Sequence, residues 1–273
     1  MSIEHFLLTR FNIASEGREK TIRKRPGWLE RRFELFEQFC LPSVAAQTNQ
    51  DFCWFIYFDC ETAPEFRNRI DNLRQRRNFE ARYVASFSNE LASLDISKRM
   101  LPQTERVITT RLDNDDALAR FFLTQVRRSA ENSPNGTILN FPSGLELASG
   151  KLYRSSHREN SFVSLVESSK DIRTVWSDPH NMLARRWRYH QIPSAPAWLQ
   201  AIHQENVANR VKGQRAKRSD DLLAFQIVPE PNIDLPNAFV IALDRAILYP
   251  ARVIRESIIG AAKYFRDLAL RSG

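Results

Sequence analysis

The stretch Arg106-Val107-Ile108-Thr109-Thr110-Arg111-Leu112-Asp113-Asn114-Asp115-Asp116 lies near the middle of a chain of 273 residues. Its first part is rich in β-branched residues, which predicts a buried strand, and helical spacing follows over residues 117–128. Three carboxylates therefore stand directly after a strand. Because crowded carboxylates repel one another, a fold keeps them together most easily when a cation neutralises them. The alternative is that Asp115 or Asp116 only caps the following helix.

The composition indicates a globular protein with anionic partners. A hydrophobic content of 42% over 273 residues is enough for one large domain or two small ones. Lys and Arg outnumber Asp and Glu by 40 to 32, and the pI of about 9.7 favours nucleotide diphosphates, anionic lipid or nucleic acid as partners. The three cysteines include no CxxC pair, so the sequence suggests neither a disulfide framework nor a zinc site.

The hydropathy pattern shows neither a secretory leader nor an apolar run of the roughly 20 residues that a membrane-spanning helix needs. We therefore expect a cytoplasmic protein with reduced thiols. The first half of the chain alternates apolar strand-like segments, at residues 5–11, 52–58 and 82–84, with helical ones. This alternation predicts an α/β fold of the Rossmann-like type, with a mostly parallel sheet flanked by helices.

The second half has another rhythm. Residues 137–141 and 151–153, with a turn at 142–144, predict a small antiparallel addition. Residues 161–167 are ambiguous between strand and helix, whereas residues 174–176 suggest a short strand. Ser219, Asp220 and Asp221 look like the start of a helix.

The C-terminal tail has the pattern of a basic amphipathic helix. Apolar residues recur at helical spacing at Ile254, Ile258, Ala261, Phe265 and Leu268, among several arginines and a lysine. Such a helix packs on its own domain, which is the ordinary case, or lies on an anionic membrane surface. We therefore expect a main domain over residues 1–228 and a helical extension over residues 229–273.

Several familiar carboxylate sites do not fit the central turn. An EF-hand loop starting at Asp113 would need a glycine sixth and a glutamate twelfth, where the chain has Leu118 and Thr124. A phosphoryl-transferring aspartate enzyme would need a threonine where Ala117 stands, and no P-loop segment is present. What remains is an Asp-x-Asp at the end of a strand, which holds a divalent ion on the diphosphate of a nucleotide sugar.

Residues 109–118 resemble the DxD motif of GT-A glycosyltransferases. A wider set of segments, spread over about residues 6–209, resembles the putative rhamnosyltransferase family. These segments are residues 9–12, 33–36, 41–43, 47–48, 51–52, 58–59, 111–118 and 198–200, together with His203 and Asn206. The resemblance implies a GT-A-like fold and the transfer of a sugar, rhamnose above all, from a nucleotide-diphosphate donor to a glycan or lipid-linked acceptor.

The resemblance also implies roles for residues at the carboxyl ends of the first strands, where open α/β sheets hold ligands. Arg10, Asn12 and Asp59 would lie near the base and ribose of the donor, and Arg111 would lie beside them. Asp113 would face the ribose or a metal-bound water.

The same resemblance implies a metal site. Asp115, with Asp113, would ligate Mn2+ or Mg2+, which stabilises the departing diphosphate as a Lewis acid. His203 matches a late histidine ligand of GT-A enzymes, although it would otherwise be read as a hydrogen-bonded helix residue. His157 and His180 are weaker candidates.

An inverting transfer would also need a carboxylate base. Glu167 is our first choice, with Asp178 and Glu159 as alternatives, and each has the plain alternative of a surface charge. The basic segment 209–218 is predicted to be a mobile loop, either a solvated linker or a cover over the diphosphate that supplies Lys212 or Arg215.

Two other functional classes stay open. A nucleic-acid-binding protein would suit the charge and the Arg-rich residues 68–77, but no RNA-recognition or zinc-finger motif accompanies them, so we expect no nucleic-acid partner. An inactive GT-A-like domain would bind metal and donor without transfer.

Overall fold

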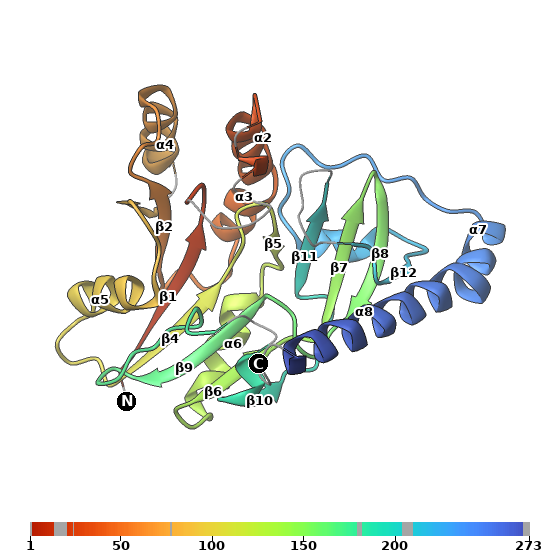
Figure 1. Cartoon of the computed structure of the whole chain (residues 1–273). Coiled ribbons are helices and arrows are strands. Elements are labelled where there is room, and N and C mark those ends of the chain that lie inside the picture. The colour runs from red at the N-terminus through yellow and green to blue at the C-terminus, as the bar shows by residue number, and fades with distance from the viewer. Residues whose placement is uncertain are drawn as a thin grey trace.

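A seven-stranded sheet forms the centre of the protein in a computed structural model, which describes residues 2–13, 21–23, 25–76, 78–178, 182–203 and 210–269. The strand order is β10-β6-β9-β4-β1-β2-β3 (Figure 1). Only β9 runs antiparallel to its neighbours, β4 and β6. The strands are β1 (Ile3–Arg10), β2 (Cys53–Asp59), β3 (Glu80–Val84), β4 (Arg106–Arg111), β6 (Thr137–Asn140), β9 (Val163–Ser168) and β10 (Arg188–Gln191). The expected α/β fold with a mostly parallel sheet is therefore confirmed.

Helices cover both faces of this sheet. One core joins the sheet to α2 (Trp28–Leu35), η1 (Phe36–Cys40), α3 (Leu41–Ala45), α4 (Pro64–Arg76) and α6 (Phe122–Glu131). The other face packs against α5 (Asn89–Arg99) and the short 3-10 helix η2 (Leu183–Arg185). Burial on both faces explains why β2 is almost wholly apolar and aromatic.

A second sheet of five strands stands beside the first, in the order β12-β8-β7-β11-β5 (Figure 1). Its strands are β5 (Ala117–Leu118), β7 (Ser143–Ala148), β8 (Lys151–Ser156), β11 (Trp198–Ile202) and β12 (Gln214–Arg215). The β7–β8 hairpin confirms the small antiparallel addition. Its turn, however, lies at Ser149 and Gly150, both with positive φ, and not at residues 142–144.

Three local predictions from the sequence are wrong. Residues 117–128 do not form one helix, because Ala117 and Leu118 pair with β11, and α6 begins only at Phe122. The N-cap of α6 is Phe121, without a side-chain cap, so neither Asp115 nor Asp116 caps it. Residues 174–176 form a turn and not a strand. The ambiguous residues 161–167 resolve as strand β9.

The segment 210–218 is held on the second sheet, contrary to the mobile loop that we expected, and Asn209 lies outside the described residues. Arg215 lies in β12 and is buried, and its guanidinium donates to Leu152 O at 3.2 Å and to Asp234 O. Ser219 caps the 3-10 helix η3 (Asp220–Ala224), which confirms a helical start there.

The tail is helical as expected, in α7 (Ala238–Leu243), η4 (Asp244–Leu248) and α8 (Tyr249–Ala269) (Figure 1). Within the described ranges, no helix has the length and apolar character needed to cross a membrane. The division of the chain at residue 228 stays a prediction.

Candidate functional site

The acidic turn joins the two sheets. The Asn114 side-chain amide donates to the carbonyl oxygens of Arg10 and Phe11, at 3.0 and 2.7 Å, which fixes the turn to the carboxyl end of β1. On the other side, Asp116 Oδ1 accepts from the backbone N–H of Ala201 in β11, at 3.0 Å. The turn that follows β4 is therefore held between the first strand of one sheet and a central strand of the other.

Asp115 is buried in this turn and meets two groups that carry or can carry positive charge. Its Oδ2 lies 2.7 Å from Arg32 Nη1 and 2.9 Å from His203 Nε2. Burial alone would raise the pKa of Asp115, but the hydrogen bond from His203 and the charge of Arg32 lower it well below its usual value. Asp115 is therefore an ionised carboxylate at neutral pH.

Asp116, next in the chain, is in the opposite state. Burial, together with the charges of Asp115 and Asp113, raises its pKa well above the usual value. Its Oδ2 is buried and has no hydrogen-bond partner among the described residues. One carboxyl group of the turn is thus neutral while its neighbour is charged, which is how the crowded turn avoids part of its own repulsion.

Two arginines, at the carboxyl ends of β1 and β4, contact the same tryptophan ring. Arg111 Nη2 contacts Asp113 Oδ2 at 3.1 Å. The guanidinium carbons of Arg10 and Arg111 lie 4.1 and 4.0 Å from the centroid of one Trp176 ring. Two cationic groups are thereby placed together by one ring, which is a suitable surface for an anionic ligand.

Asn12 and Asp59 meet at the ends of β1 and β2, as the sequence predicted. Asn12 Oδ1 accepts from the Asp59 backbone N–H at 3.0 Å, and its amide donates to Thr62 Oγ1 at 3.0 Å. Asp59 Oδ2 forms an ion pair of 2.9 Å with Arg23. Asn12 therefore ties the end of β1 to the turn after β2, while Asp59 pairs with Arg23, and a contact of either residue with a donor stays a prediction.

A cavity of about 680 Å³ opens beside His203. This volume lies in the range of small-molecule sites. The lining residues are Arg25, Pro26, Arg31, Glu34, Leu35, Gln38 and His203. Glu34 is the only carboxylate among these residues, and it is exposed. The cavity therefore combines basic side chains, one carboxylate and the histidine that contacts Asp115.

The structure does not bring Glu167 to this site. Glu167 pairs in register with Val107, near the amino end of β4, so about 13 Å of strand separates it from the level of Arg111. Its carboxylate accepts from the backbone N–H groups of Arg173 and Thr174, at 2.9 and 3.0 Å, and burial raises its pKa to about 7. Glu167 closes a loop, so the prediction that it serves as the base does not fit.

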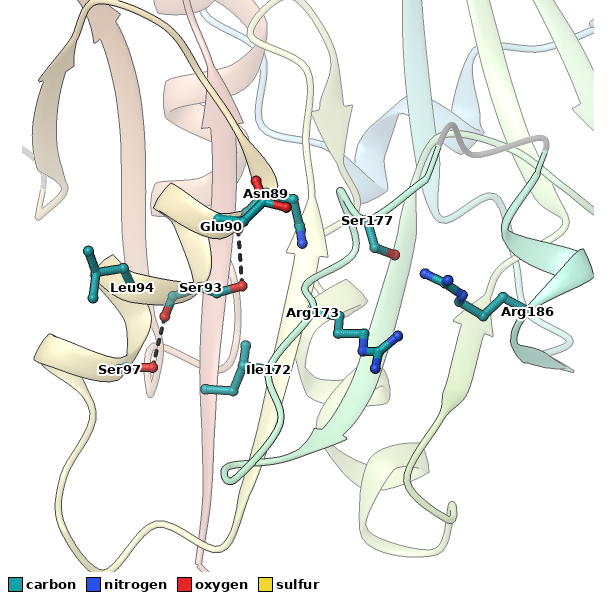
Figure 2. A pocket seen from close by; sticks show the side chains of 9 residues that line it. All are labelled: Asn89, Glu90, Ser93, Leu94, Ser97, Ile172, Arg173, Ser177 and Arg186. Carbon is teal, nitrogen blue, oxygen red and sulfur yellow. Dashed lines mark hydrogen bonds between the residues drawn. The ribbon is translucent and has the colours of Figure 1, made fainter.

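Asp178 lies on the α5 side of the sheet, 3.5 Å from Arg186. Arg186 and Ser177 line a separate cavity of about 550 Å³ between α5 and the loop that follows β9. Figure 2 shows Arg173 and Arg186 pointing toward each other from two different segments of this cavity. The described contacts of Asp178 therefore belong to this second cavity.

The remaining candidates lie on the second sheet. The backbone N–H of Lys212 donates to Glu146, and the side chain of Arg215 is buried in β12, so the prediction that Arg215 covers the diphosphate does not fit. His157 lies 3.7 Å from Glu146 and stacks on Trp198. Trp198 in turn covers Gly144, where an added Cβ would come within 2.1 Å of the indole. His180 lies outside the described residues.

The fit of the acidic turn to a divalent cation is partial. Asp115 Oδ2 and His203 Nε2 are neighbours at 2.9 Å, which is a hydrogen-bond distance, so the two candidate ligands lie side by side. The third predicted ligand, Asp113, faces Arg111 instead, and Arg32 contacts the same Asp115 oxygen. Across the described ranges, no three His, Cys, Asp or Glu side chains converge on one point.

Three residues of this site are absent from the sequence-based candidates, namely Arg32, Glu34 and Trp176. Arg32 and Glu34 belong to an amphipathic helix whose charged residues look solvated in the sequence. Their partners lie far away in the chain, since Asp115 is 83 residues from Arg32. Trp176 stands in a short segment after β9, and nothing in the sequence pattern indicates that it contacts Arg10 or Arg111.

Solved structures that resemble this chain share little sequence with it. The S. aureus TarS 1–349 structure in complex with UDP is 11% identical with a TM-score of 0.45, and the match covers 74% of this chain and 61% of that one. A putative nucleotide-diphospho-sugar transferase from Desulfovibrio desulfuricans is 13% identical with a TM-score of 0.38, covering 74% and 82%. For 4-diphosphocytidyl-2C-methyl-D-erythritol synthase from Anaerococcus prevotii, the identity is 11%, the TM-score 0.37 and the coverage 81% and 95%.

No curated protein matches the sequence. A family model does, and its match runs over residues 4–215, which include both sheets, the acidic turn and His203. The family is described as "Putative rhamnosyl transferase". This match covers most of the chain and agrees with the resemblance read from the sequence segments. The chain belongs to this family.

Proposed function

We propose that the protein transfers a sugar, rhamnose above all, from a nucleotide-diphosphate donor to a glycan or lipid-linked acceptor, with Mn2+ or Mg2+ as cofactor. The observation that carries this proposal is the meeting of Asp115, Arg32 and His203 beside a cavity of about 680 Å³. A buried ionised carboxylate, a guanidinium and an imidazole at the carboxyl edge of a parallel sheet suit the binding of a diphosphate and its counter-ion.

The donor binds, in this proposal, along the carboxyl ends of β1, β2 and β4. Arg10 and Arg111 attract the anionic donor, and Trp176 keeps the two guanidinium groups in place. Asp59 lies toward the base and ribose, on the side of β2. The chain's net charge of +8 supports an anionic substrate, although it does not choose the base or the sugar.

Asp115 and His203 are the residues that would hold the cation, with Asp113 as a further ligand once it leaves Arg111. When bound, the cation supplies Lewis-acid stabilisation of the departing diphosphate. Arg32 balances the charge of Asp115 without a cation, so Arg32 and the cation are alternative partners of the same carboxylate oxygen. With Asp115 holding a cation, Arg32 would be available to donate to an oxygen of the diphosphate.

Glu34 replaces Glu167 as our candidate for the base that takes the proton of the acceptor hydroxyl. It lines the same cavity as His203, whereas Glu167 accepts hydrogen bonds from a loop near the other end of β4. An exposed carboxylate on a helix can contact an acceptor that enters from solvent, and proton transfer of this kind contributes about 10²–10⁴-fold to rate.

The test is to measure release of nucleoside diphosphate from dTDP-, UDP- and GDP-linked sugars, with and without Mn2+. We expect release from at least one donor that needs the cation, and loss of it in Asp115→Ala. Full turnover in Asp115→Ala would contradict the metal role. Donor binding without release, with any acceptor offered, would instead indicate an inactive binding domain.

A nucleic-acid-binding function is the second candidate, motivated by the excess of basic residues. A mobility shift with RNA or DNA that weakens with salt and is unaffected by nucleotide sugars would favour it over transfer.

A further inference from the structure

The C-terminal helices turn a polar face toward their own domain. Asp244 in η4 is buried, and it accepts from the Arg215 backbone N–H at 2.8 Å and from Arg252 at 2.5 Å. One turn further along α8, Arg255 donates to Val211 O at 2.8 Å, and Glu256 pairs with Arg210 at 3.5 Å. Ion pairs and hydrogen bonds to residues 210–215 therefore fix the orientation of the helix about its own axis.

The outer face of the same helices is apolar. Ile247, Ile254 and Ile258 are 59%, 61% and 64% exposed, and Phe239 in α7 is 74% exposed. Residues 251, 254, 255, 258 and 259 line a shallow, mostly apolar hollow. Residues 247, 251, 254 and 258 recur at helical spacing, so they form one stripe, here called the outer stripe. In η4 and the described part of α8, the usual arrangement, with the apolar face turned toward the domain, is reversed, whereas Ile241 of α7 is buried.

The domain itself cannot cover the outer stripe. Rotating α8 to bury Ile254 and Ile258 would expose Asp244 and Arg252 and break their contacts with β12. A second copy of the chain would fit poorly as well. The described acidic residues of η4 and α8, Asp244 and Glu256, pair with arginines, while Arg255 lines the same hollow as Ile254 and Ile258, so two copies would bring like charges together.

An anionic bilayer surface is complementary to this face. Apolar side chains of an interfacial helix enter the boundary between headgroups and acyl chains, while arginines at the edges contact the lipid phosphates. We propose that α7, η4 and α8 lie on an anionic membrane surface, with the outer stripe inserted and Arg255 at the headgroups. No helix crosses the bilayer in this arrangement.

Together with the proposed function, on which this step rests, membrane docking indicates the kind of acceptor. The helices are held by residues 210–215, and this segment follows closely after His203, at the end of β11. Membrane docking therefore brings the domain that carries the candidate transfer site to the bilayer surface. The acceptor that suits this placement is a lipid-linked glycan, presented at the membrane surface.

The experiment is co-sedimentation of the full chain with vesicles of phosphatidylcholine alone, or of phosphatidylcholine mixed with phosphatidylglycerol. We expect binding to the mixed vesicles that weakens with salt, and about a tenfold or greater loss of binding in the double variant Ile254→Ser/Ile258→Ser. Leu223→Ser is the matched control, because Leu223 is 77% exposed but lies in η3. Both variants change exposed side chains, so folding is preserved.

Equal sedimentation of the double variant and the unmodified chain would overturn the proposal, as would the absence of binding to anionic vesicles. A dimer in solution that the double variant dissociates would show that a second copy covers the stripe, and would also overturn it. Because sedimentation needs neither donor nor acceptor, its result is independent of whether the protein transfers a sugar.

Discussion

Two buried carboxylates lie near opposite ends of β4, and their partners differ. At the carboxyl end, Asp115 contacts Arg32 and His203, and its pKa is lowered despite burial. Toward the amino end, the hydrogen-bond partners of Glu167 are two backbone N–H groups, and burial raises its pKa to about 7. Burial is common to both sites. The charged partners decide which carboxylate is ionised and available to bind a cation.

The largest expected effect follows from removing the carboxylate at the carboxyl end. Asp115→Ala leaves Arg32 buried without its charged partner, which costs about 3–5 kcal/mol in the free energy of unfolding. The measurement is chemical denaturation of the unmodified protein and of the variant. Asp171→Ala is the control, because Asp171 is 73% exposed and its change should cost little.

The double variant Asp115→Leu/Arg32→Met sharpens this test. Replacing a buried ion pair by apolar residues is often close to neutral, so we expect it to be more stable than Asp115→Ala. A cost under about 1 kcal/mol for Asp115→Ala would show that Arg32 does not depend on this carboxylate.

Glu167, toward the amino end of β4, should make the free energy of unfolding depend on pH. Because the folded-state pKa of Glu167 is raised from 4.5 to about 7, its stabilising contribution is complete below about pH 4.5 and is lost as pH rises to about 7. The loss amounts to at most about 3 kcal/mol. Glu167→Gln should remove this part of the pH dependence, as measured by denaturation across that window. An unchanged pH profile in the variant would contradict the raised pKa.

The proposed base Glu34 is tested by activity and not by stability. Glu34→Gln should lower kcat by about a hundredfold, because the acceptor hydroxyl loses its base, with little change in KM for the donor. Glu30→Gln is the control, since Glu30 is an exposed carboxylate of α2 outside the cavity. Similar rates for the two variants would remove Glu34 from the mechanism.

The smallest effect is expected at Trp176, which lies at the same edge of the sheet as Asp115. Trp176→Leu removes the ring over which Arg10 and Arg111 lie, which costs about 1 kcal/mol of donor binding, or about a fivefold rise in Kd. Calorimetric titration with the nucleoside diphosphate measures it. Trp187→Leu is the matched control, because Trp187 packs in the same core without a described arginine contact. Equal changes in the two variants would point to loss of packing alone.

The sequence was sufficient to predict the parallel sheet, because alternating strands and helices carry local signals. It also brought Asp115 and His203 together, through the family resemblance. It predicted the β7–β8 hairpin of the second sheet but not β5, which Ala117 and Leu118 form by pairing with β11, 80 residues later. Pairing between residues so far apart in the chain overrides the helical spacing of residues 117–128. No local sequence pattern predicts such a pairing.

The catalytic base shows the same limit. Glu167 lies in the chain between the β7–β8 hairpin and His203, which made it a candidate. The direction of its strand, however, decides at which end of the sheet its side chain lies. Because β9 runs antiparallel to β4, Glu167 lies toward the end away from the acidic turn. The tail shows another limit, because its helix was predicted but its orientation was not. Its amphipathic pattern was correctly read, but the pattern does not say which face turns inward, and here ion pairs such as Asp244–Arg252 hold the polar one against the domain.

One measurement tests the central claim most directly, namely the rate of nucleoside diphosphate release by Asp115→Asn and Glu167→Gln, assayed side by side at saturating donor and Mn2+. We expect Asp115→Asn to lose at least about a hundredfold, because the ionised carboxylate disappears, while Glu167→Gln stays close to the unmodified protein. A large loss in Glu167→Gln with Asp115→Asn unaffected would contradict the assignment of the transfer site to the carboxyl end of β4.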